Sequence, residues 1–205
     1  YLHAITALDG GRALFFRSGN PDDAPPEVWL TDGTSAGTLQ VATLPAQAQV
    51  QQSVTGGPFA YLRLRVGFDD ALWVSDATSA GTLPVTAFLD PTSAVGTLRV
   101  IEGVAYFGVR ANTLGEELWR SDGTASGTLA ITEFGFHNPF GGYDSAARPE
   151  RLVVLNGTVF FIATDGIQPP QLWLSRGQPD SMRVVADICD YCDGTSWVAV
   201  AGTSV

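Results

Sequence analysis

The chain has 205 residues, a formal net charge of −10, and a composition that is 45% hydrophobic and 16% charged. This hydrophobic content predicts a folded protein with a sizeable core. All 11 basic residues are arginine, against 21 acidic residues, so the sequence offers no basic face for nucleic acid. No apolar run approaches the ~18 residues of a membrane-spanning helix. We therefore expect neither a nucleic-acid partner nor a transmembrane segment.

The predicted elements follow the same order four times along the chain. The first unit begins with an apolar strand, turns at Gly10-Gly11, and continues through the aromatic pair Phe15-Phe16 into a loop. A third strand through Trp29 leads to an Asp-Gly-Thr turn and a fourth strand, and no window shows a sustained helical period. The later units repeat the glycine turn at 56–57, 102–103 and 156–157, the aromatic site at Tyr61, Tyr106-Phe107 and Phe160-Phe161, and the tryptophan at Trp73, Trp119 and Trp173.

The spacing of the four tryptophans indicates the fold class. They are 44, 46 and 54 residues apart, a period typical of stacked or circular repeats. Four antiparallel strands in a unit of this size are characteristic of a β-propeller blade. The sequence therefore predicts an all-β protein, a β-propeller of four-stranded antiparallel blades.

The sequence predicts a single β-propeller region over residues 1–205 that consists of consecutive repeats. The last residues, SWVAVAGTSV, are similar to the first strand and turn of a repeat, which predicts the start of a fifth unit. Two interpretations stay open, namely part of a larger propeller and a four-bladed ring closed by overlapping terminal strands. The predicted repeats are roughly 1–44, 45–90, 91–134 and 135–188, with 189–205 as the start of the fifth.

The tryptophan phrases carry a resemblance to a known family. EVWLTDGTSAGT at 27–38 and EELWRSDGTASGT at 116–128 are the clearest copies, LWVSDATSAGT at 72–82 is close, and LWLSRGQPDSM at 172–182 is divergent. These phrases resemble the bacterial ELWxxDGT repeat across essentially the whole chain. The resemblance implies a propeller fold and a secreted or surface protein, located outside the cell, at the cell surface or in the periplasm. It implies little about activity.

The repeated motif is expected to be structural. Asp and Thr side chains bond backbone N–H groups in tight turns, and Gly adopts positive φ, so Asp32, Asp76 and Asp122 are predicted to build turns. The motif acid or glycine is lost at Ala71, Ala77, Gln171 and Arg176, which argues against one ligand carboxylate in every repeat. The tryptophans Trp29, Trp73, Trp119 and Trp173 are predicted to fill the space between blades, with a sugar-stacking ring as the alternative.

Residues outside the motif are the candidates for binding a partner. Acidic residues precede the tryptophan strands, and their loops would share one face of a propeller, where they would attract cations or a basic protein. An insertion at 134–150 places aromatic residues together in a long loop, which suggests a protein or glycan contact. The predicted partner-binding residues are Asp22, Asp23, Asp69, Asp70, Glu116, Glu117, Phe136, His137, Phe140 and Tyr143.

The segment DICDYCDG at 187–194 combines two cysteines with three carboxylates. Cys189 and Cys192 are too few for a zinc site, and a local disulfide is the predicted state in an exported protein. Asp187, Asp190 and Asp193 make a weak calcium loop the only cofactor candidate, without the spacing of an EF-hand. We otherwise expect no cofactor.

Catalytic motifs are absent from the sequence. It contains no GxSxG, HExxH or phosphate-binding loop, and it has two histidines and no lysine. The sequence therefore favours a non-catalytic extracellular repeat scaffold for protein–protein interaction or assembly at the cell surface. A carbohydrate-binding propeller is the alternative, and a glycoside or ester hydrolase is the least favoured interpretation.

Overall fold

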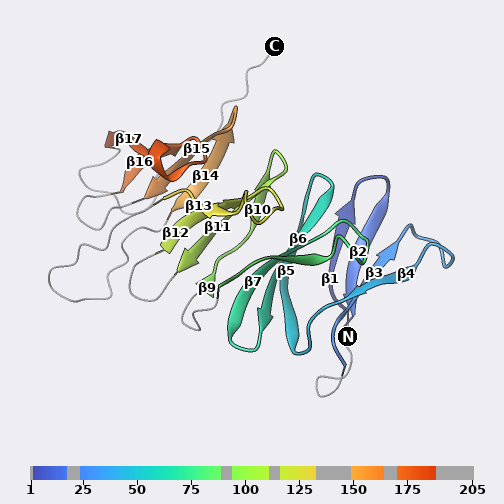
Figure 1. Ribbon diagram of the computed structural model, residues 1–205. Helices are drawn as coiled ribbons and strands as arrows, with labels where there is room; N and C mark the ends of the chain where they lie inside the picture. The colour runs from blue at the N-terminus through green and yellow to red at the C-terminus, as the bar shows by residue number, and fades with distance from the viewer. Residues whose placement is uncertain are drawn as a thin grey trace, which may run out of the picture. The chain divides into compact units, whose positions relative to one another are not determined.

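A computed structural model describes residues 2–17, 24–88, 94–110, 116–132, 149–163 and 170–187. These residues form four antiparallel sheets that follow one another along the chain (Figure 1). Each sheet contains a path of four strands in which each strand pairs with the next one, and the third sheet has one additional short strand. The prediction of an all-β protein with four-stranded antiparallel units is confirmed.

Sheets 1 and 2 have the same plan. Sheet 1 contains β1 (Leu2–Leu8), β2 (Arg12–Arg17), β3 (Glu27–Thr31) and β4 (Leu39–Thr43). Its first hairpin turns at two glycines with φ of 77° and 72°, and such paired positive φ values match the twist of the flanking strands. Sheet 2 contains β5 (Ala48–Gly56), β6 (Phe59–Val66), β7 (Asp69–Ser75) and β8 (Leu83–Phe88).

Sheets 3 and 4 repeat this plan with small additions. Sheet 3 contains β10 (Arg99–Ile101), β11 (Val104–Arg110), β12 (Glu116–Ser121) and β13 (Leu129–Ala130), and β9 (Ala94–Val95) also pairs with β11. Sheet 4 contains β14 (Glu150–Leu155), β15 (Thr158–Ala163), β16 (Gln171–Ser175) and β17 (Arg183–Asp187), with the 3-10 turn η1 (Pro179–Ser181) before β17. Each sheet lies within one predicted repeat.

The chain divides into two compact units. The first comprises Tyr1–Phe107 and Ser121–Thr128, and the second comprises Gly108–Arg120 and Leu129–Val205. In the described part of the chain, no helix has the length and apolar character needed to cross a membrane.

Each sheet has two faces, which the register defines. In sheet 1 the row Ile5, Phe15, Trp29 and Gln40 lies on one face, which we call the Trp face. Leu14, Phe16 and Val28 alternate with this row and lie on the other face, which we call the aliphatic face. We use the same two names for the equivalent faces of the other sheets.

The core of the first unit lies between sheets 1 and 2. Leu14, Phe16 and Val28 from the aliphatic face of sheet 1 form one buried cluster with Leu62 and Leu64 of sheet 2. Leu62 pairs with Trp73, so these sheet 2 residues belong to its Trp face. The aliphatic face of sheet 1 therefore packs on the Trp face of sheet 2.

Candidate functional site

The Asp-Gly-Thr turn is held by a compact set of side-chain hydrogen bonds. In sheet 1, Asp32 Oδ1 accepts from the Thr34 backbone N–H at 2.9 Å and from the Thr34 hydroxyl at 2.8 Å. The Thr34 hydroxyl oxygen accepts in turn from the Gly37 N–H at 3.0 Å, and the Thr38 hydroxyl donates to the Thr34 carbonyl at 2.6 Å. Asp32 thus acts as an acceptor that shapes the turn.

The same hydrogen bonds recur in the next two repeats. Asp76 accepts from the Thr78 N–H and hydroxyl at 2.9 and 2.7 Å, and Asp122 accepts from the Thr124 N–H and hydroxyl at 3.0 and 2.7 Å. Each turn also pairs the residue before the Asp with the last Thr, at 2.7 Å between Ser75 Oγ and Thr82 Oγ1. The Asp-Gly-Thr motif and its variant Asp-Ala-Thr therefore form the same hydrogen-bonded turn in the first three repeats.

The divergent fourth repeat builds its turn from a serine. Arg176 replaces the Asp, and the Ser181 hydroxyl oxygen accepts from the Arg176 N–H at 2.8 Å. The Ser181 hydroxyl also donates to the Gln178 carbonyl at 2.6 Å. Ser175 keeps its place, accepting from the Gly177 N–H at 3.1 Å. The turn thus survives without its carboxylate.

The glycine five residues after the motif Asp lies against the Asp carboxylate, which leaves no room for a side chain at that position. A Cβ on Gly81 would lie 2.0 Å from Asp76 Oδ1, and a Cβ on Gly37 or Gly127 would meet the Asp32 or Asp122 carboxyl at similar distances. Such distances are far below van der Waals contact, so a side chain at these positions would displace the aspartate. The pairing of Asp with the Gly five residues later follows from this close approach.

We expect Gly81→Ala to lower the free energy of unfolding by about 1–3 kcal/mol, because the new methyl group forces Asp76 out of the turn. Urea denaturation measures the change. In Asp76→Ala/Gly81→Ala the carboxylate is absent, so the glycine substitution should cost much less there than in the wild-type background. Additive losses in this double-mutant cycle would contradict the proposed clash.

The Asp32 carboxylate is exposed, and its hydrogen bonds from Thr34 hold the pKa of Asp32 below its ordinary value of 3.8. A depressed folded-state pKa adds stability above the unfolded-state pKa, and this contribution disappears as the pH falls through the folded-state pKa. We expect Asp32→Ala to be less stable than wild type at neutral pH. The difference should narrow below pH 3.8 in urea titrations, and a constant difference would contradict the role of the charge.

The tryptophans lie half-buried on the sheets. Trp29 stacks on Phe15 with ring centroids 6.0 Å apart, and its indole N–H donates to Glu27 Oε2 at 2.9 Å. Trp73 packs against the buried cluster between sheets 1 and 2. The Trp173 indole donates to the Ala163 carbonyl at 3.2 Å. The indole rings of Trp29, Trp73 and Trp173 therefore contact other residues of the same chain.

The predicted acidic residues occupy different environments. Asp70 is buried, with its side chain only 6% exposed, and Asp69 is half-buried. Glu117 accepts a hydrogen bond from the Thr132 hydroxyl, and the Glu116 carboxylate lies over Gly108, where a Cβ would be 1.8 Å away. The structure therefore does not present these four carboxylates as one exposed group.

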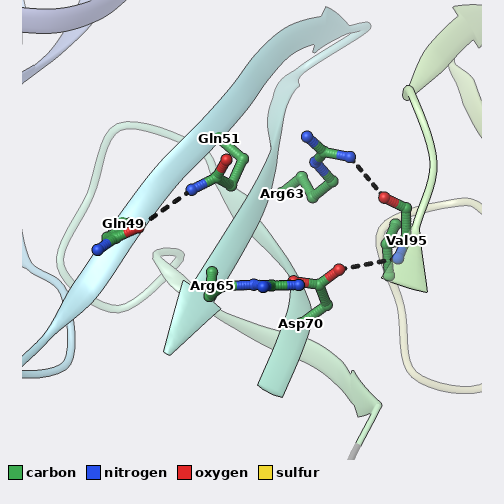
Figure 2. A network of polar contacts seen from close by, with 6 residues as sticks. All are labelled: Gln49, Gln51, Arg63, Arg65, Asp70 and Val95. Atoms are coloured by element: carbon green, nitrogen blue, oxygen red, sulfur yellow. Dashed lines mark hydrogen bonds and ion pairs between the residues drawn. The ribbon is translucent and has the colours of Figure 1, made fainter. Parts of the chain in front are cut away.

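Asp70 is the centre of a polar network on sheet 2 (Figure 2). Its Oδ1 accepts from Arg65 Nε at 2.9 Å, and its Oδ2 accepts from the Val95 N–H at 2.8 Å. The Val95 carbonyl accepts from Arg63 Nη1, so the two charged side chains of β6 and β7 bind both backbone groups of one β9 residue. The hydrogen bond and ion pair with Asp70 raise the pKa of Arg65 above its ordinary value.

Two further side chains of sheet 2 bind the backbone of sheet 3 within the first unit. The Gln52 amide donates to the Leu98 carbonyl at 3.0 Å and accepts from the Leu98 N–H at 2.8 Å. The buried Tyr61 hydroxyl lies 3.1 Å from the Gly103 carbonyl and 3.2 Å from the Ser121 carbonyl. The sequence did not single out Gln52, Arg63 and Arg65. The two arginines stand out only as charged residues in the otherwise apolar strand β6, and Gln52 lies in the polar strand β5.

Several predicted site residues lie outside the described part of the chain. These are Asp22 and Asp23, the insertion residues Phe136, His137, Phe140 and Tyr143, the cysteines Cys189 and Cys192, and the calcium candidates Asp190 and Asp193, together with the side chain of Asp187. Among the residues that the structure does describe, no group of three or more His, Cys, Asp or Glu side chains could hold a metal ion.

The comparisons with solved structures concern the fold. A prolyl endopeptidase structure matches with a TM-score of 0.53 and 16% identity, over 87% of this chain and 26% of that chain. Prolyl oligopeptidase B from Galerina marginata, bound to a 35mer hydrolysis and macrocyclization substrate, matches with a TM-score of 0.51 and 14% identity, over 89% and 26%. No family model matches the chain, and no curated protein matches it.

These similarities define the class of fold. The four antiparallel sheets are similar to the β-propeller domains of prolyl oligopeptidases. The chain spans about a quarter of the length of these structural neighbours. At such low identity the likeness establishes the fold alone.

The comparisons overturn the functional prediction made from the sequence. That prediction favoured a surface interaction scaffold, with a carbohydrate-binding propeller as the alternative, whereas the similar structures are those of prolyl peptidases. The physical reason for the error lies in the motif. The Asp-Gly-Thr phrase specifies a turn between two strands, and that turn carries no information about the ligand or the chemistry of the whole protein.

Proposed function

We propose that this chain is the β-propeller part of a longer, peptidase-related protein. The observation that carries the proposal is the match to a prolyl endopeptidase over 87% of this chain but only 26% of that one. The four sheets would be consecutive blades, and the catalytic groups would belong to another part of the protein. The ELWxxDGT relationship and the extracellular location stay predictions.

The contacts between sheets suggest what such a part would contribute. Gln52, Tyr61 and Asp70 tie sheet 2 to backbone atoms of sheet 3, and aliphatic side chains join sheets 1 and 2. These contacts favour a rigid body that would move relative to a catalytic domain. In the prolyl endopeptidases of the first matched structure, inter-domain dynamics have a role in catalysis and specificity. We propose a comparable influence on peptide specificity here.

Two assays test the proposal. The protein that contains this chain in its native source, captured with an antibody to the chain, should cleave a fluorogenic proline-containing peptide. The purified 205-residue chain should not cleave it. Cleavage by the purified chain would contradict the assignment of catalysis to another part, and absence of cleavage by the native protein would contradict the peptidase relationship.

A further inference from the structure

The first hairpin of sheet 4 turns at the only Asn-Gly pair in the sequence. Asn156 and Gly157 are the two residues between β14 and β15, and the pair Leu155 and Thr158 closes the turn. Both turn residues have positive φ, 50° for Asn156 and 71° for Gly157. Consecutive positive values belong to a tight hairpin turn in which Asn-Gly is a preferred sequence. The amide side chain thus lies at the tip of a hairpin.

This tip is open to water and makes few contacts. Asn156 and Gly157 are both exposed. A Cβ added to Gly157 would meet no atom within 4 Å, so no neighbouring group packs over this glycine. In the described part of the chain, no residue forms a hydrogen bond with the Asn156 side-chain amide. The amide is therefore not held away from the backbone that follows it.

We propose that Asn156 is a site of spontaneous deamidation and isoaspartate formation. The backbone nitrogen of Gly157 attacks Cγ of Asn156 and forms a C–N bond. The Cγ–Nδ2 bond then breaks, and ammonia leaves with the proton that the Gly157 nitrogen loses. Water opens the resulting succinimide ring at either carbonyl, which gives aspartate or isoaspartate at position 156. The net reaction consumes water, releases ammonia, and does not depend on the peptidase relationship.

The residue after the asparagine restricts this reaction to position 156. Glycine leaves the attacking nitrogen unhindered, because it has no side chain. The other asparagines are Asn20 and Asn138, each followed by proline, and Asn112, followed by threonine. A proline nitrogen carries no proton to lose, and the branched threonine side chain crowds the nitrogen. Ring closure also needs a rotation of the Asn156 backbone, which a hairpin tip permits because such ends open locally at low free energy.

The isoaspartate product does not fit the turn. It adds a methylene group to the main chain, whereas the two-residue turn places Leu155 opposite Thr158. An ordinary acidic residue does fit, because Glu102 has φ of 52° in the equivalent turn of sheet 3, between Ile101 and Val104. We therefore expect isoaspartate, and not the added charge, to weaken the pairing of β14 with β15.

Peptide mapping by mass spectrometry tests the site. The purified 205-residue chain is incubated for weeks at mildly alkaline pH and physiological temperature. Aspartate and isoaspartate should accumulate at position 156, faster at higher pH, because hydroxide deprotonates the attacking nitrogen. The matched control is Asn156→Glu, which copies the Glu102-Gly103 turn and should stay unmodified. Asn156 that stays intact, while a free Leu-Asn-Gly-Thr peptide is modified, would overturn the proposal.

Glu102→Asn tests whether exposure matters beyond the Asn-Gly sequence. It places Asn-Gly in a turn with φ of 52° and 79°, close to the values in sheet 4. Gly103 is half-buried, and its carbonyl lies 3.1 Å from the Tyr61 hydroxyl, so this turn is more constrained. Position 102 should be modified several-fold more slowly than position 156 of the same molecule. Equal or faster modification at position 102 would contradict the role of the open tip.

Asn156→Asp separates the effect of isoaspartate from that of the charge. Aged wild-type chain is fractionated by ion exchange, and isoaspartate is detected by methyl transfer from S-adenosylmethionine with an isoaspartyl methyltransferase. The isoaspartate fraction should unfold at a lower urea concentration than Asn156→Asp, which has the same charge and an ordinary backbone. Circular dichroism verifies that the variants are folded. Equal midpoints would contradict the predicted effect on the hairpin.

Discussion

Replacing Phe16 with alanine should lower the free energy of unfolding by about 3–5 kcal/mol. The Phe16 side chain is fully buried in the cluster that joins the aliphatic face of sheet 1 to sheet 2. Its removal eliminates apolar burial and leaves a cavity between the two sheets, because the backbone hydrogen bonds of β2 prevent full collapse. Chemical denaturation followed by tryptophan fluorescence measures the loss.

Phe15 provides a matched control in the adjacent position. It has the same side chain on the same strand, but it is half-buried on the Trp face of sheet 1. Phe15→Ala should therefore lower the free energy of unfolding clearly less than Phe16→Ala does. Equal losses would contradict the assignment of Phe15 to the more exposed face of sheet 1.

Replacing Asp70 with alanine should lower the free energy of unfolding by about 2–3 kcal/mol. The substitution removes the acceptor of the buried Val95 N–H and the partner of Arg65, which are 2.8 and 2.9 Å from the carboxylate. The lost Val95 hydrogen bond accounts for most of the effect, because the Arg65 side chain is 43% exposed and can be solvated. Urea denaturation measures the change.

Two variants separate the parts of this network. Asp70→Asn keeps an oxygen that can accept from Val95 but loses the charge, so it should cost less than Asp70→Ala. Asp69→Ala is the positional control, since Asp69 is the half-buried neighbour of Asp70, and it should change stability by less than about 0.5 kcal/mol. If Asp69→Ala were as destabilising as Asp70→Ala, the network would not explain the effect of Asp70.

Local patterns made much of the fold predictable. The two-residue glycine turns predicted hairpins because only a few residues adopt consecutive positive φ values. The tryptophan period predicted units of four strands, and the structure has four such sheets. The Asp-Gly-Thr phrase predicted turns, and both hydrogen bonds that Thr34 donates to Asp32 join residues only two positions apart in sequence.

The polar network was not predictable because its members are far apart in sequence. Asp70 was selected as an acidic loop residue available to a partner, but its Oδ2 binds Val95, 25 residues later. Gln52 binds Leu98 across 46 residues, and nothing in the local sequence of either residue indicates the other. Such partners are chosen by the packing of neighbouring sheets.

The sequence by itself determined the strands, the turns and the size of the repeat, because these depend on backbone conformation and hydrogen bonds between nearby residues. Only the tertiary structure decided which side chains are available. It buried the Asp70 carboxylate beside Arg65, and it left Phe15 of the first sheet half-buried although its counterparts Leu62 and Phe161 are fully buried. The physical reason is that burial depends on the neighbouring sheet, and similar repeats have different neighbours.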